Sequence, residues 1–161
     1  MTKTFEDEFM EWQIDMLEIA NDYVGGRAEK IYIYGSIENG AYFFNLFFKM
    51  NNRIVFMNQV NSVLDENEPK LDVSHSKQST VLHVGVEDLE EIEIVCQKYQ
   101  KPVPTQFKLF YDMTKEELDT KYQYDLQYSN TEDVYTDDIF MAWYEEVKSA
   151  VENPPLEFGF E

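Results

Sequence analysis

The sequence predicts an α+β protein: a single domain built on an antiparallel sheet of about five strands, in the order α-βββ-α-ββ-α. Helices are expected at both termini, with one more between strands. Three observations support this: apolar residues recur every three or four positions in three segments, they alternate in five others, and Asn39-Gly40 is a strong hairpin signal. The 161 residues fit one domain, which we assign to 1–152, with 153–161 as a short C-terminal tail.

An amphipathic helix is predicted over residues 4–23. Most of its acidic residues fall off the apolar stripe, and those in its first turn suit the positive end of the helix dipole. Gly25-Gly26 should end it. The residues of the stripe are Phe5, Phe9, Trp12, Met16, Ile19, Ala20 and Tyr23.

Three strands are predicted next, at 30–38, 41–50 and 53–60, and they form a meander. Asn39-Gly40 and Asn51-Asn52 supply the two turns, because both accept the positive φ that tight hairpins need.

The strands of this meander are apolar on both faces, although a sheet with one solvated face needs only one apolar parity. We expect the main face to pack on the N-terminal helix through Phe9, Trp12 and Met16. We expect the other parity, carrying Tyr32 and Tyr34, to be only partly covered in the monomer and available to a partner or a second copy. Burial of this parity beneath a helix is the alternative.

A polar connection at 61–73 precedes a helix predicted over about 87–100, which has Leu89, Ile92, Cys96 and Tyr99 on one face and is ended by Pro102 and Pro104. Its start is left open between residues 74 and 87, because the valine-rich segment 81–86 also fits a short strand.

Two further strands are predicted at 105–112 and 118–128. The second has one apolar and one polar parity, which places it nearer an edge of the sheet than 41–50. A last helix should be capped by Thr136 with Asp137-Asp138 and end at Asn153-Pro154-Pro155.

Charge is the strongest compositional signal: 32 Asp and Glu against 13 Lys and Arg give a net charge of -19. Binding to nucleic acid or to an anionic membrane requires clustered cations, so neither partner is expected. A strongly negative surface favours a basic partner instead. No signal peptide and no apolar run of membrane-spanning length is recognised, and a single cysteine argues against a disulfide framework, so a cytoplasmic location is expected.

No residue pattern predicts catalysis, a cofactor or a metal, and we expect no enzyme. Cys96 falls on the apolar stripe of its helix, which favours a buried thiol over a nucleophile. The segment around His75 matches no nucleophile motif. His83 and Glu87 lie four apart, but two ligands do not make a metal site.

The acidic run of the central helix is the candidate partner interface. Like charges three and four residues apart on a helix repel, and few nearby cations relieve them. A solvated helix face is the alternative. The candidate interface consists of Glu87, Asp88, Glu90, Glu91 and Glu93, together with Tyr32 and Tyr34.

Three stretches carry a family resemblance: "KIYIYGSIENGAYFFNLFFKMNNRIVFMNQ", "PTQFKLFYDMTKEELDTKYQYDLQYS" and "DDIFMAWYEEVKS". Over about residues 5–150 the chain resembles the YezG-like immunity proteins, the group that includes the EsaG antitoxin. The resemblance implies a protein that neutralises a secreted bacterial toxin, typically a nuclease, inside the cell that makes it. It supplies no catalytic residues. The alternative is an acidic adaptor that binds a protein without inhibiting it, and either a monomer or a homodimer is compatible with the sequence.

Overall fold

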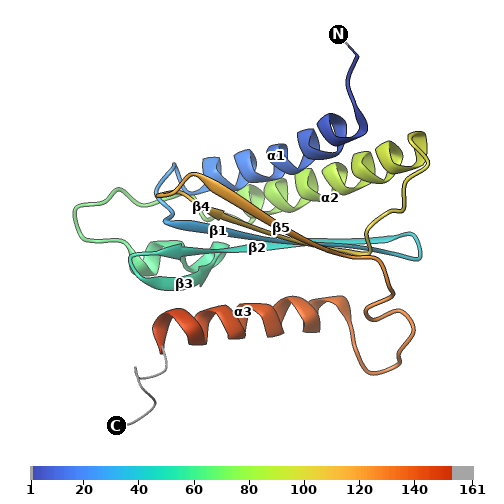
Figure 1. Ribbon diagram of the computed structural model, residues 1–161. Coiled ribbons are helices and arrows are strands. Elements are labelled where there is room, and N and C mark those ends of the chain that lie inside the picture. The colour runs from blue at the N-terminus through green and yellow to red at the C-terminus, as the bar shows by residue number, and fades with distance from the viewer. Residues whose placement is uncertain (1, 154–161) are drawn as a thin grey trace, which may run out of the picture.

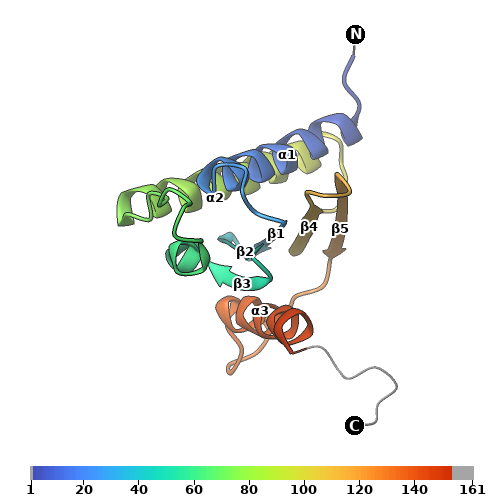
Figure 2. The ribbon, with the colours of Figure 1, turned by 90° about the vertical axis from the view of Figure 1, so that its left-hand side faces the viewer.

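One five-stranded sheet lies between two helical layers in the computed structural model, which describes residues 2–153 (Figures 1 and 2). All strand pairs are antiparallel and the strand order is β3-β2-β1-β4-β5. The predicted fold class and element order are confirmed, while residues 154–161 of the predicted tail lie outside the described residues. The elements are α1 (Phe5–Tyr23), β1 (Lys30–Glu38), β2 (Ala41–Met50), β3 (Arg53–Phe56), η1 (Met57–Val63), α2 (His75–Lys98), β4 (Gln106–Asp112), β5 (Glu117–Gln123) and α3 (Thr136–Glu152).

Local signals set most element boundaries as predicted, but the N-cap of α3 is Tyr135 and not Thr136, which is the first residue of the helix. Thr4 and Asp7 form a capping box at the start of α1, in which each side chain accepts a hydrogen bond from the other residue's backbone N–H at 3.1–3.2 Å. Both hairpin turns have positive φ, with values of 50° and 76° at Asn39 and Gly40.

The helix α2 begins at His75, which resolves the start left open by the sequence. Ser74 is its N-cap, because its side chain accepts a hydrogen bond from the backbone N–H of Lys77 at 3.2 Å. The residues 81–86 are therefore helical, and the short-strand alternative is wrong.

Two predicted strands are too long. The third ends at Phe56, where the chain turns into η1, and Met57 and Val60 are buried at a helical spacing of three. The fifth ends at Gln123 because the following segment turns to bind Glu38. The backbone N–H groups of Gln127 and Ser129 donate to its carboxylate at 2.7 and 3.1 Å. The prediction that this strand lies nearer the edge is confirmed.

The helices α1 and α2 cover one face of the sheet side by side (Figure 2). Met16 is buried there, and Phe9 and Trp12 pack against the same core, as predicted. The helix α2 approaches β2 closely at Gly85, where an added Cβ would lie 2.1 Å from the ring of Phe44. A glycine is therefore needed at this position.

The second face of the sheet is covered by α3 (Figure 1). Tyr32 is 5% exposed and Tyr34 is fully buried, so the expectation that both stay partly uncovered is wrong. Tyr32 stacks on Phe47, with ring centroids 4.7 Å apart, and α3 adds Phe140 and Trp143 to the same cluster. Burial raises the pKa of both tyrosines to about 12. The second apolar parity is core, because α3 brings an apolar stripe of its own to cover it.

Among residues 2–153, no helix combines the length and the apolar character that crossing a bilayer requires.

Candidate protein-binding surface

The structure does not bring the predicted interface residues together. Tyr32 and Tyr34 lie in the core beneath α3, and Asp88 is buried between α1 and α2 at 3% exposure. These three residues are therefore removed from the candidate interface. The acidic run contributes four residues that reach solvent to some degree, namely Glu87, Glu90, Glu91 and Glu93.

These four carboxylates divide between two sides of α2. Residues three or four apart share a helix face, so Glu87, Glu90 and Glu91 lie on the outward side, while Glu93 lies nearer the sheet. Glu87 is exposed and lies 3.7 Å from the imidazole of His83. Glu93 is half-buried and accepts a hydrogen bond from the hydroxyl of Tyr42 on β2. The run is thus not one continuous patch.

Asp88 forms a close carboxyl pair with Asp15 across the α1–α2 contact. Burial, followed by the neighbouring carboxyl of Asp15, raises the pKa of Asp88 from its ordinary value of 3.8 to about 8. Its Oδ2 has no hydrogen-bond partner among the described residues. Asp88 therefore belongs to the packing of the two helices and cannot contact a partner directly.

Negative charge concentrates in the α1–α2 layer as a whole. The helix α1 holds seven acidic residues and no Lys or Arg, and α2 holds five acidic residues and two lysines. The two helices together carry 2 − 12 = −10 of the net charge of -19. Sequence reasoning missed the share of α1, although seven acidic residues without a cation in 19 positions was a visible signal.

The acidic residues of both helices meet on the side of the layer that faces away from the sheet. Glu8 contacts Lys98 and Asp15 contacts Asp88, so α1 and α2 run antiparallel. Met16 and Ala20 define the side of α1 that faces the sheet, and positions about half a helical turn away face outward. We call this outward surface the acidic face; it consists of Glu11, Asp15 and Glu18 on α1 and Glu87, Glu90 and Glu91 on α2.

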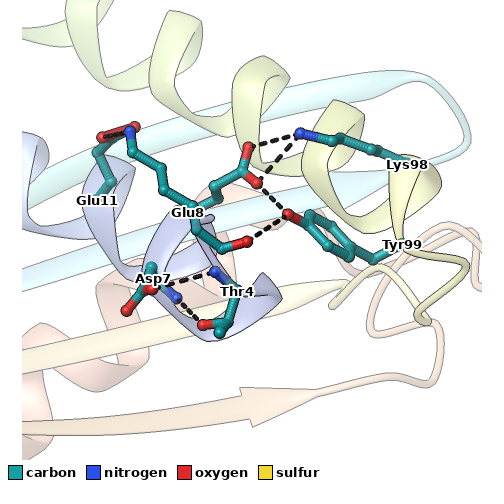
Figure 3. Close-up of polar contacts among 7 residues, drawn as sticks. Thr4, Asp7, Glu8, Glu11, Lys98 and Tyr99 are labelled. Atoms are coloured by element: carbon teal, nitrogen blue, oxygen red, sulfur yellow. Dashed lines mark hydrogen bonds and ion pairs between the residues drawn. The ribbon is translucent and has the colours of Figure 1, made fainter. Parts of the chain in front are cut away.

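Polar contacts at one end of the layer hold the two helices in place (Figure 3). The ammonium of Lys98 donates to both carboxylate oxygens of Glu8 at 3.1 Å, and the hydroxyl of Tyr99 also donates to Glu8. The hydrogen bonds from Tyr99 and then Lys98 lower the pKa of Glu8. Lys3 pairs with Glu11 at 2.8 Å. The cations at this end are therefore engaged, and among residues 2–153 no lysine or arginine pairs with Asp15, Glu18, Glu87 or Glu91.

An exposed isoleucine adds an apolar contact to the acidic face. Ile94 is 55% exposed and lies three residues after Glu91 and seven after Glu87, on the same side of α2. Apolar anchors surrounded by polar residues are typical of protein-binding surfaces. The acidic face therefore combines charge with an apolar anchor, as a protein partner requires.

One hydroxyl–imidazole contact lies on the exposed surface of α2, where the hydroxyl of Ser79 is 3.3 Å from Nε2 of His75. No three His, Cys, Asp or Glu side chains of residues 2–153 gather closely enough to hold a metal ion. Cys96 is fully buried, as predicted, and burial raises the pKa of its thiol to about 11.

No protein-family description matches this chain, and a search of curated proteins found no match. The resemblance to the YezG-like immunity proteins therefore stays a prediction.

Proposed function

We propose that this protein is an immunity protein, which binds a cognate secreted bacterial toxin inside the producing cell and neutralises it. The proposed toxin is a nuclease domain with a basic cleft. The observation that carries the proposal is the acidic face, a set of carboxylates on two packed helices that together carry −10 of the formal net charge of -19.

The chemistry of a nuclease explains why such a surface suits it. A nuclease binds a polyanion and therefore presents clustered cations around its active site. A protein surface of opposite charge is steered towards those cations, and association between complementary proteins reaches about 10⁸–10⁹ M⁻¹s⁻¹ at low salt. Fast association matters because an immunity protein must occupy the toxin before it reaches the genome or RNA of the producing cell.

The helices give the acidic face a fixed shape. The contacts of Glu8 with Lys98 and Tyr99 hold α1 against α2, and both helices pack on the sheet. A carboxylate array on rigid elements binds without first ordering a loop, which lowers the entropic cost of association.

The experiment measures association with the toxin domain encoded beside this gene. The test variant, Glu18→Lys with Glu87→Lys, reverses one exposed carboxylate on each helix. The control variant, Glu132→Lys with Asp133→Lys, changes the net charge equally on an exposed loop. We expect the association rate of the test variant to fall by about tenfold more than that of the control at low salt, with the difference shrinking at about 1 M salt, where the Debye length is about 3 Å.

Equal rates for the two variants at low salt would contradict the acidic-face mechanism. A nuclease assay at a stoichiometric ratio separates the two classes of function. Loss of nuclease activity on binding supports an immunity protein, and binding with full retention of activity supports the acidic adaptor instead.

A further inference from the structure

The two edges of the sheet differ in how they are protected. At the β3 edge, the backbone N–H of Ile54 donates to the carboxylate of Glu152 on α3 at 2.7 Å. The hydroxyl of Tyr144, also on α3, donates to the carbonyl of Ile54 at 3.4 Å. The helix α3 therefore occupies the groups with which another strand would pair. At the other edge, β5 pairs only with β4 among residues 2–153.

The sheet register identifies the unpaired groups of β5. The bonds from Ile37 N–H to the carbonyl of Thr105 and from Met113 N–H to that of Glu29 are both 3.0 Å, so odd-numbered residues of β4 bond to β1. Even-numbered residues of β4 then bond to β5, where they pair with odd-numbered residues such as Lys121. The N–H and C=O groups left facing outward are those of Leu118, Thr120 and Tyr122.

The sequence of this edge, Glu-Leu-Asp-Thr-Lys-Tyr-Gln, is self-complementary about its central residue. When the strand is placed antiparallel to a copy of itself with Thr120 opposite Thr120, Asp119 lies opposite Lys121 in both halves. Leu118 then lies opposite Tyr122. Opposite charges and apolar–aromatic pairs at directly opposed positions both stabilise antiparallel strands.

We propose that β5 pairs antiparallel with β5 of a second copy, about a two-fold axis through Thr120, and so joins two sheets into one. In this register the central pair, Thr120 with Thr120 of the second copy, is a hydrogen-bonded pair. The outward N–H and C=O groups of Thr120 supply the donors and acceptors of these bonds. This inference concerns self-association and does not depend on the proposed function.

Charge selects this register over its neighbours. Asp119 and Lys121 are on the same side of the sheet, where they line a cleft together with Tyr32 and Trp143. A shift of two residues keeps the backbone groups aligned but places Asp119 opposite Asp119, or Lys121 opposite Lys121, and like charges directly opposed are destabilising. A lysine in an edge strand usually discourages pairing. Of these three registers, only the one centred on Thr120 gives Lys121 an acidic partner without placing like charges opposite each other.

The experiment is sedimentation equilibrium of the full chain over a range of concentrations. Asp119→Lys and Lys121→Asp each turn two attractive cross-strand pairs into two repulsive ones, so we expect each to weaken dimerisation by about tenfold. The double variant restores the complementarity with reversed polarity and should restore the dimer. Glu132→Lys changes the net charge as Asp119→Lys does, at an exposed position away from the edge, and should not weaken the dimer.

The charge change of Asp119→Lys makes the test discriminating. The protein has a net charge of -19, so adding positive charge reduces the general repulsion between two copies. Weaker dimerisation of this variant therefore reports on register and not on net charge. For the same reason the wild-type dimer should tighten as the salt concentration rises, because screening shortens the range of the general repulsion more than it weakens contacting pairs.

A backbone variant tests the edge independently. Thr120→Pro removes an N–H that faces outward, so pairing with β4 should persist and the circular dichroism spectrum should be unchanged, while dimerisation is lost. A wild-type protein that stays monomeric at all concentrations overturns the proposal, as does a double charge swap that fails to restore the dimer. The proposal is also overturned if the protein is monomeric and β5 pairs only with a strand of the toxin after the toxin is added.

Discussion

The buried carboxyl of Asp88 predicts an unusual dependence of stability on pH. Its pKa is about 8 in the folded protein, whereas an unfolded chain has the ordinary value near 3.8. At a pH between these two pKa values, Asp88 holds a proton in the folded state that it has lost in the unfolded state. Stability contributed by this group is therefore complete below about pH 4 and is lost as the pH rises towards 8, at up to about 1.4 kcal/mol per pH unit.

The expected magnitude follows from the surroundings of Asp88. A shift of this size held in full corresponds to about 6 kcal/mol. We expect about half of that, 2–3 kcal/mol, because the neighbouring Glu87 and Glu91 reach solvent and water screens their charges and that of Asp15. Asp88→Asn replaces the protonated carboxyl by a neutral group of the same shape that can donate to Asp15. Relative to the wild type, the variant should gain about 2 kcal/mol of stability between pH 5 and pH 8.

The assay is urea unfolding of both proteins at several pH values from 5 to 8, with Glu90→Gln as the control because it removes an exposed carboxylate from the same helix. Carboxylates with lowered pKa values, such as Glu38 and Glu152, lose their contribution only as the pH falls below about 4.5 and so act outside this window. A constant difference in unfolding free energy between Asp88→Asn and the wild type across the window would refute the reasoning.

Two further predictions concern packing and the segment after β5. Gly85→Ala should lower the free energy of unfolding by about 2 kcal/mol, because its Cβ would meet the ring of Phe44 at 2.1 Å, and adding Phe44→Leu should recover part of the loss in urea unfolding. No recovery in the double variant would show that the clash is not the cause. Glu38→Gln should cost about 2 kcal/mol and speed proteolytic cleavage within 124–135, because the carboxylate accepts four hydrogen bonds from Gln127, Tyr128 and Ser129. Unchanged cleavage would contradict this role.

The elements that the sequence predicted well depend on local chemistry. Asn39-Gly40 fixes a turn through its own φ angles, and Thr4 caps α1 through side chains three residues apart. The errors arose where distant residues decide. The strand predicted to run to residue 128 ends at Gln123, because the following segment turns towards Glu38, about 90 positions earlier.

The candidate site could be predicted only in part for the same reason. The sequence identified the acidic run of α2, and Glu87 and Glu90 of that run are exposed in the structure. Spacing does not say which helix packs beside α2, and Asp88 is buried because α1 occupies that position. Tyr32 and Tyr34 were predicted to be partly exposed, but they are buried. The apolar stripe of α3 covers the second apolar face of the meander, and the sequence analysis did not pair these two surfaces.

The central position of β1 has a consequence for how the chain folds during synthesis. Its neighbour on one side, β2, follows within a few residues, but its neighbour on the other side, β4, begins only at Gln106. At about 5–20 residues per second, the ribosome takes roughly 4–14 s to make the intervening 70 or so residues, from Glu38 to Gln106 and beyond. During that time β1, the most completely buried strand of the finished sheet, has an open edge. The α1–β1–β2–β3 portion must therefore wait as an incomplete sheet, and its many carboxylates keep such nascent chains apart by mutual repulsion.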